Sequence, residues 1–91
     1  MFSTVQGLCG KIDHEIEYIN INLDMYEGKL DNPNGYTNEF LLGFVARQFE
    51  SLSRTIESLA TRSTNDRLIK EYRNKYKSVV TRFSEILWGK V

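Results

Sequence analysis

The chain has 91 residues, with 12 basic and 12 acidic side chains and therefore no formal net charge. A hydrophobic fraction of 41% is typical of a folded globular protein and excludes a disordered chain. No apolar run approaches the roughly 18 residues of a membrane span, and the N-terminus lacks the pattern of a secretory signal. We therefore expect one cytoplasmic helical domain over residues 1–91, with no membrane partner.

Charge is distributed unevenly along the chain. Residues 1–31 contain two lysines and six acidic residues, a net charge of −4. Residues 62–91 contain eight basic and three acidic residues, a net charge of +5. The beginning and the end of the chain are therefore expected to attract each other, either within one molecule or between copies.

The first expected element is a helix over about residues 4–27. Its apolar residues recur with the 3-4 spacing of heptad packing, and they are Val5, Cys9, Ile12, Ile16, Ile19, Leu23, Tyr26 and Leu30. Gly28 is expected to end the helix, with Leu30 folded back onto it. A second stripe, about 180° away, contains His14, Tyr18, Ile21 and Met25. One small domain buries only one such stripe in its own core, so we expect the second to contact another polypeptide chain.

A turn sequence over residues 31–35 precedes a second expected helix at about residues 38–62, with Thr37 or Asn38 as its N-cap. The core stripe of this helix is expected to contain Leu41, Val45, Phe49, Leu52, Ile56 and Leu59. Phe40 and Phe44 lie roughly 100° from the centre of that stripe. Two placements are open for them: against the 31–36 loop, or together with the second stripe of the first helix in one exposed patch.

A short connection with a Ser63-x-x-Asp66 capping-box pattern leads into a third expected helix over about residues 65–88. Its core stripe is expected to contain Ile69, Tyr72, Tyr76, Val79, Phe83 and Ile86. Trp88 lies off this stripe and either anchors the tail or adds to the exposed patch. The fold class is therefore all-α with coiled-coil-like heptad packing: an antiparallel three-helix bundle, or a long helical hairpin with the first helix packed along it.

Residues with catalytic or metal-binding chemistry are few. His14 is the only histidine and Cys9 the only cysteine, and a separation of five residues does not aim both at one ion on a helix. Neither a phosphate-binding glycine loop nor a nucleophile elbow occurs in the sequence. We therefore expect no metal, no cofactor and no enzymatic activity.

Basic residues cluster on the solvent side of the third helix. Lys70, Arg73 and Lys77 fall within about 60° of one another, and Arg67 lies about 60° further round. Such a stripe fits the phosphates of a nucleic acid or of a phosphorylated ligand. The alternative is that these cations pair with the acidic first helix.

The sequence as a whole favours a small cytosolic protein-binding module that acts by occlusion or scaffolding, in the manner of an inhibitor, an immunity-type protein or a co-chaperone. We expect a homo-oligomer that also binds another protein. The predicted interface residues are His14, Tyr18, Ile21, Met25, Phe40, Phe44 and Trp88. Phosphate or nucleic-acid binding through the third helix is the alternative function.

Overall fold

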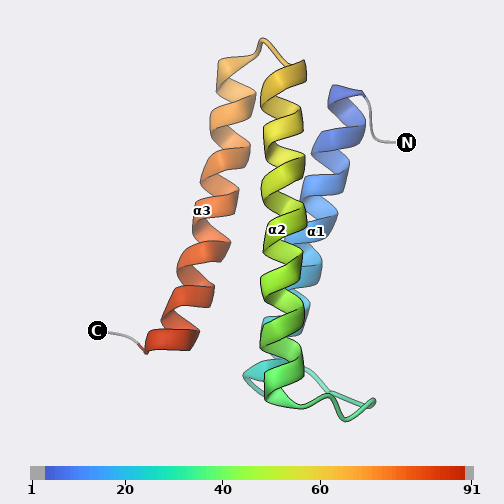
Figure 1. Cartoon of the computed structure of the whole chain (residues 1–91), viewed down its shortest axis with the longest axis vertical. Helices are drawn as coiled ribbons and strands as arrows, with labels where there is room; N and C mark the ends of the chain where they lie inside the picture. The colour runs from blue at the N-terminus through green and yellow to red at the C-terminus, as the bar shows by residue number, and fades with distance from the viewer. Residues whose placement is uncertain (1–3, 90–91) are drawn as a thin grey trace.

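The computed structural model describes residues 4–89, which form three helices: α1 (Val5–Tyr26), α2 (Asn38–Arg62) and α3 (Asp66–Trp88). Consecutive helices run in opposite directions (Figure 1). The predicted all-α antiparallel three-helix bundle is therefore confirmed, and the helix ends lie within one or two residues of the predicted ones.

Each helix begins at a polar residue whose side chain accepts a hydrogen bond from a backbone N–H in the first turn; these residues are Thr4, Thr37 and Asn65. The capping box predicted to start at Ser63 is wrong, because Asn65 is the N-cap of α3. The Ser63 hydroxyl instead accepts a hydrogen bond from the Asn65 backbone N–H at 3.1 Å. Asn is among the best N-cap residues, so it takes the position directly before the helix.

The end of α1 is set by Gly28, which has a positive φ of 77°. The Lys29 N–H donates to the Asp24 carbonyl at 2.8 Å and the Gly28 N–H to the Met25 carbonyl at 3.2 Å. This is the Schellman arrangement, in which glycine takes the left-handed conformation at low cost. The predicted return of Leu30 onto the helix is wrong, because this side chain remains 45% exposed.

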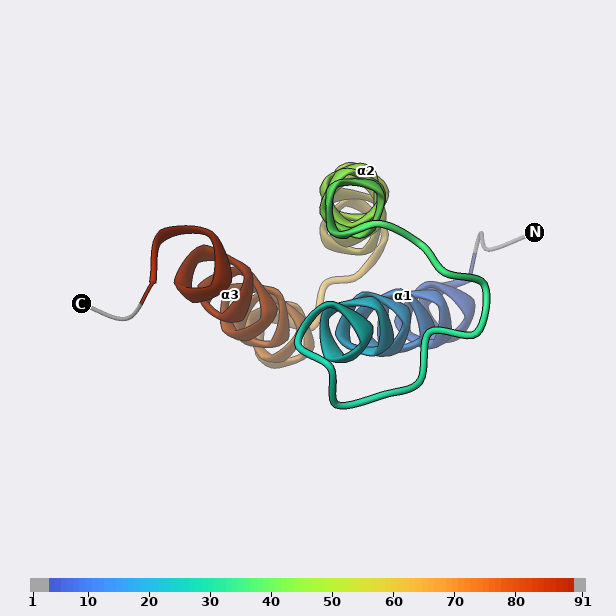
Figure 2. The same ribbon diagram turned by 90° about the horizontal axis from the view of Figure 1, so that it is seen from below.

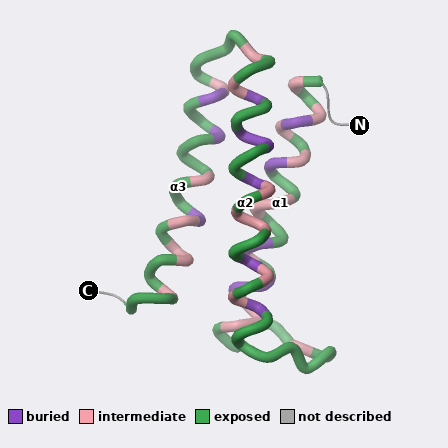
Figure 3. The backbone as a smooth tube through the Cα atoms, in the orientation of Figure 1, coloured by how far each residue is buried: buried purple, intermediate pink, exposed green. Residues whose placement is uncertain are grey.

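The core lies mainly between α1 and α2 (Figure 3). The fully buried side chains are Ile12, Ile19 and Leu23 of α1 and Leu41, Val45, Leu52 and Leu59 of α2. The predicted stripes of both helices therefore supply the core. Leu8 is also buried, although the predicted stripe passes through its neighbour Cys9. On α3, only Ile69, Tyr72 and Val79 are buried.

Polar contacts attach α3 to α1. The Lys75 ammonium lies 3.1 Å from an Asp13 carboxylate oxygen, and the Tyr72 hydroxyl donates to the same carboxylate at 3.0 Å. Burial and this hydrogen bond raise the pKa of Tyr72 above its ordinary value. Further along, the Arg82 guanidinium donates to Asp24 at 2.5 Å. Part of the basic excess of the third helix therefore pairs with the acidic first helix.

The three helices leave one side of the molecule open. Viewed along the helices, α3 lies on one side of the α1–α2 pair, and the connection between α1 and α2 lies on the other side (Figure 2). The extents are 41 × 33 × 18 Å and the radius of gyration is 14.2 Å. A compact domain of this length has a radius of gyration of about 12 Å. The chain is therefore flatter than a closed bundle.

Candidate protein-binding groove

A groove runs along the open side of the α1–α2 pair, and we call it the α1–α2 groove. Its first part, about 450 Å³, lies beside the connection between the helices and is lined mainly by Tyr18, Ile21, Met25, Phe40 and Phe44, with Pro33 and Tyr36 from the connection. Its second part, about 420 Å³, continues along both helices past His14, Glu15, Arg47, Gln48 and Ser51. Tyr18 and Phe44 line both parts, so the two parts are adjacent.

Aromatic rings of α2 and of the connection before it form one wall of the groove. The rings of Tyr36 and Phe40 stack with centroids 4.8 Å apart, and those of Phe40 and Phe44 follow at 6.1 Å. On α1, His14 and Tyr18 meet edge to face at 5.5 Å. The two placements considered for Phe40 and Phe44 are therefore both realised. These rings pack on the connection and also join the second stripe of α1.

Much of this apolar surface is in contact with water. Tyr18 is 48% exposed, Phe40 45% and Ile21 36%. Met25 and Phe44 are partly buried. A contiguous patch of large apolar side chains on a small domain is typical of an interaction site, and tyrosine is among the residues that dominate binding at such sites.

The structure brings six of the seven predicted interface residues together at this groove, and the exception is Trp88. Trp88 ends α3 and is 81% exposed. The end of α3 lies on the opposite side of the α1–α2 pair from the connection between these two helices, and that connection lines the first part of the groove (Figure 2). Trp88 therefore does not line the groove, and its contribution to an interface stays a prediction.

The floor of the second part of the groove is polar. The Ser51 hydroxyl donates to one Glu15 carboxylate oxygen at 2.5 Å. The other oxygen of Glu15 is buried and has no hydrogen-bond partner within residues 4–89. Beside them, the side-chain amide of Asn22 donates to the side-chain oxygen of Gln48 at 3.0 Å. The sequence analysis did not single out Glu15, Gln48 and Ser51, because these residues are polar and lie outside the predicted core stripes of α1 and α2.

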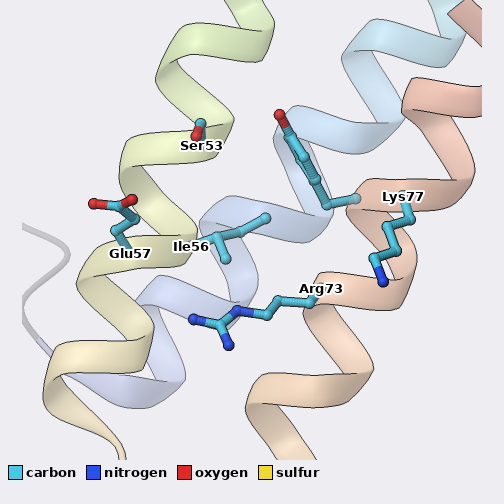
Figure 4. Close-up of a pocket in the computed structure, with 6 residues that line it drawn as sticks. Ser53, Ile56, Glu57, Arg73 and Lys77 are labelled. Atoms are coloured by element: carbon cyan, nitrogen blue, oxygen red, sulfur yellow. The ribbon is translucent and has the colours of Figure 1, made fainter. Parts of the chain in front are cut away.

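The predicted phosphate contacts occupy a different surface. Arg67, Lys70, Arg73 and Lys77 are all exposed on α3, and none of them lines the α1–α2 groove. No ion pair joins these four to any residue between positions 4 and 89, and the pairing with α1 is made by Lys75 and Arg82 instead. Arg73 and Lys77 line a separate pocket of about 270 Å³ between α2 and α3 (Figure 4).

No group of three metal-ligating side chains occurs in the described part of the chain. None of α1, α2 and α3 has the length and apolarity that crossing a bilayer requires. Cys9 packs partly buried against the core. Comparison of the chain with protein-family models, with curated proteins and with solved structures found no match.

Proposed function

We propose that this protein is a small cytoplasmic protein-binding module that uses the α1–α2 groove as its contact surface. It acts by occlusion or scaffolding and not by catalysis, and it associates with itself as well as with another protein. One observation carries the proposal: six predicted interface residues, from two helices more than ten residues apart in sequence, converge on one open groove.

The exposed apolar surface at this groove favours association. Burying one large apolar side chain stabilises a complex by about 1.5–3 kcal/mol, before the entropic cost of association. Tyr18, Ile21 and Phe40 are each at least a third exposed, so a partner has substantial apolar surface left to cover. An inhibitor, an immunity-type protein and a co-chaperone all work by such covering contacts.

The test is sedimentation of the purified protein and of the double variant Tyr18→Asp/Ile21→Asp. Two carboxylates in the groove lose hydration when a partner covers them, so the variant is expected to sediment as a single chain while the parent is oligomeric. The matched control is Ala46→Asp/Thr81→Asp, which adds the same charge at exposed positions outside the groove. If the double variant keeps the parent's mass, or the parent is itself a single chain, self-association through this groove is refuted.

A second candidate function is binding of a phosphorylated ligand or nucleic acid by α3. The specific observation in its favour is that Arg73 and Lys77 line one pocket while remaining free of ion pairs with residues 4–89 (Figure 4). Phosphate binding weakens steeply as salt rises, whereas apolar contact holds or tightens. A salt-independent affinity for nucleic acid, or an affinity unchanged in Arg73→Gln/Lys77→Gln, would exclude this function.

A further inference from the structure

The α1–α2 groove has two halves of different chemistry. Beside the connection it is lined mainly by large apolar side chains, and no charged side chain of the described residues lines this part. Further along, the groove is lined by Glu15 of α1 and Arg47 of α2. Glu15 is partly buried and accepts a hydrogen bond from Ser51, whereas Arg47 is exposed. The charge that a ligand meets at this end of the groove is therefore mainly that of a cation.

Cations continue along the same face beyond Arg47. At about 100° per residue, Arg54 falls within about 20° of Arg47 on α2, and both side chains are exposed. Arg62 of α2 and Lys11 of α1 also belong to the faces that border the groove. Because α1 and α2 are antiparallel, the first half of α1 lies beside the second half of α2 (Figure 1). These four cations therefore lie toward the end of the groove that is remote from the connection.

The domain itself does not neutralise the arginines of this basic half. Neither Arg47 nor Arg54 forms an ion pair with any residue between positions 4 and 89. The acidic residues Asp13 and Asp24 of α1 pair with α3 instead. Glu15 is the one acidic residue that lines the second part of the groove, and it is already hydrogen-bonded within the domain. A ligand that covers this half is therefore favoured if it carries negative charge.

We propose that the α1–α2 groove binds an amphipathic helix of a partner protein, with large apolar side chains at one end and acidic side chains at the other. The apolar end lies between Tyr18 and Phe44, and the carboxylates lie beside Arg47 and Arg54. Burial of the apolar face of a helix in a groove between helices is a recurrent mode of recognition. This inference rests on the proposed function, because it names the kind of partner that uses the same groove.

The distribution of charge favours a protein segment over a nucleic acid. A nucleic acid carries a phosphate at every nucleotide, so its charge is continuous along a groove, whereas the cations here occupy one half only. In the other half, Phe40 stacks with both Tyr36 and Phe44, so these rings already contact one another instead of lying open to bases. A helix of a partner protein can carry its carboxylates at one end alone and so matches both halves.

The first test selects helical peptides of about 15 residues, or about four turns, from a randomised display library on the immobilised protein. The selected sequences are expected to have large apolar residues in one half and Asp or Glu in the other. A parallel selection on Arg47→Gln/Arg54→Gln is expected to keep the apolar preference and lose the acidic one. Glutamine is a good helix former and both positions are exposed, so folding is expected to be retained. Selected sequences without acidic enrichment, or the same enrichment on the variant, overturn the proposal.

The second test measures the dissociation constant of one selected peptide by fluorescence anisotropy, at a protein concentration at which the chain sediments alone. Arg47→Gln/Arg54→Gln is expected to raise it about fivefold, because two exposed ion pairs are lost. The matched control, Arg67→Gln/Arg73→Gln, removes the same charge from α3 and is expected to leave it unchanged. Rising salt is expected to weaken binding to the parent and to the control much more than to Arg47→Gln/Arg54→Gln. Equal dissociation constants for the two variants overturn the proposal.

The groove itself is tested with the same peptide and Tyr18→Asp/Ile21→Asp. If this variant loses the peptide while Arg47→Gln/Arg54→Gln binds it as tightly as the parent, the groove remains the contact surface and only the acidic partner is refuted. If the peptide still binds Tyr18→Asp/Ile21→Asp, both this inference and the proposed function fail.

Two other occupants are separate outcomes. Displacement of the peptide by a fluorescent single-stranded oligonucleotide whose binding requires Arg47 and Arg54 assigns the groove to a nucleic acid. Self-association that requires the same two arginines assigns the basic half to a second copy of this chain. Either result overturns the proposal.

Discussion

Arg82 holds the C-terminal half of α3 against α1. Its guanidinium donates to Asp24 at 2.5 Å, to Asn20 at 2.8 Å and to Glu27 at 2.7 Å. The substitution Arg82→Met keeps the apolar stem and removes every donor. A hydrogen bond to a charged group contributes about 1.5–3 kcal/mol when it is well buried. The Arg82 and Asp24 side chains remain 26% and 34% exposed, so solvent screening reduces the contribution of this hydrogen bond to stability. We expect Arg82→Met to lower the free energy of unfolding by about 1 kcal/mol through the bonds to Asp24 and Asn20.

The assay is thermal unfolding followed by circular dichroism at one fixed protein concentration, because association raises the midpoint. A loss of about 1 kcal/mol lowers the midpoint by about 4–8 °C in a domain of this size. The control is Lys75→Met, which removes an ion pair to Asp13 whose two side chains are 43% and 51% exposed. This control is expected to cost less than half as much. A parent-like midpoint for Arg82→Met, or equal losses for the two variants, would refute the reasoning.

The same contact makes a prediction about pH. The hydrogen bond from Arg82, and to a lesser extent the charge of Lys29, hold the pKa of Glu27 below its ordinary value of 4.5. A lowered folded-state pKa stabilises the protein above the unfolded value, and this stabilisation is lost as the pH falls through the lowered pKa. The difference in midpoint between the parent and Arg82→Met is therefore expected to be largest above about pH 5 and to shrink below about pH 4. A difference that stays constant to about pH 3 would show that Arg82 does not act through Glu27.

Two further predictions concern the core and the helix ends. Ile19→Val removes one methyl group from a fully buried site, so we expect the free energy of unfolding to fall by about 0.5–1.5 kcal/mol in denaturant unfolding of dilute protein. The control is Ile21→Val, which changes an exposed side chain and is expected to cost almost nothing. Equal losses for the two variants would contradict the assigned core. Thr37→Ala removes the side-chain cap of α2 and is expected to cost about 1 kcal/mol in the same assay, whereas Thr64→Ala, which removes no cap, is expected to cost much less. A Thr37→Ala midpoint equal to that of Thr64→Ala would show that the cap does not contribute.

The helices and most of the core follow from periodicity alone. A residue such as Leu23 or Leu52 is recognisable because its neighbours three and four positions away are also apolar. Leu8 was missed because it and Cys9 flank the centre of the stripe on either side. An α-helix drifts by about 20° per heptad, so a strict 3-4 pattern loses accuracy toward the helix end. In the structure Leu8 is buried and belongs to the core, whereas Cys9 is only partly buried.

The groove was only partly predictable, because its two walls come from different helices. The second stripe of α1 and the position of Phe44 on α2 are visible in the sequence. Their meeting depends on how the connection turns and on the register of α1 against α2, which no local pattern specifies. The position of Trp88 outside the groove depends on the same tertiary arrangement. The pairing of Arg82 was not predicted either, because nothing in the spacing distinguishes it from the other cations of α3.

The contact of α3 with the α1–α2 pair and the proposed contact with a second copy respond differently to salt. On one side, α3 is attached by a few buried residues together with the ion pairs of Lys75 and Arg82, which salt and acid weaken. On the other side, the proposed contact with a second copy is mainly apolar and is expected to persist or strengthen as salt rises. The exposed cations of α3 do not line the groove, so a phosphorylated ligand and a second copy do not compete for the same surface. A salt titration therefore separates the two candidate functions in a single protein: ligand binding is lost while the dimer remains.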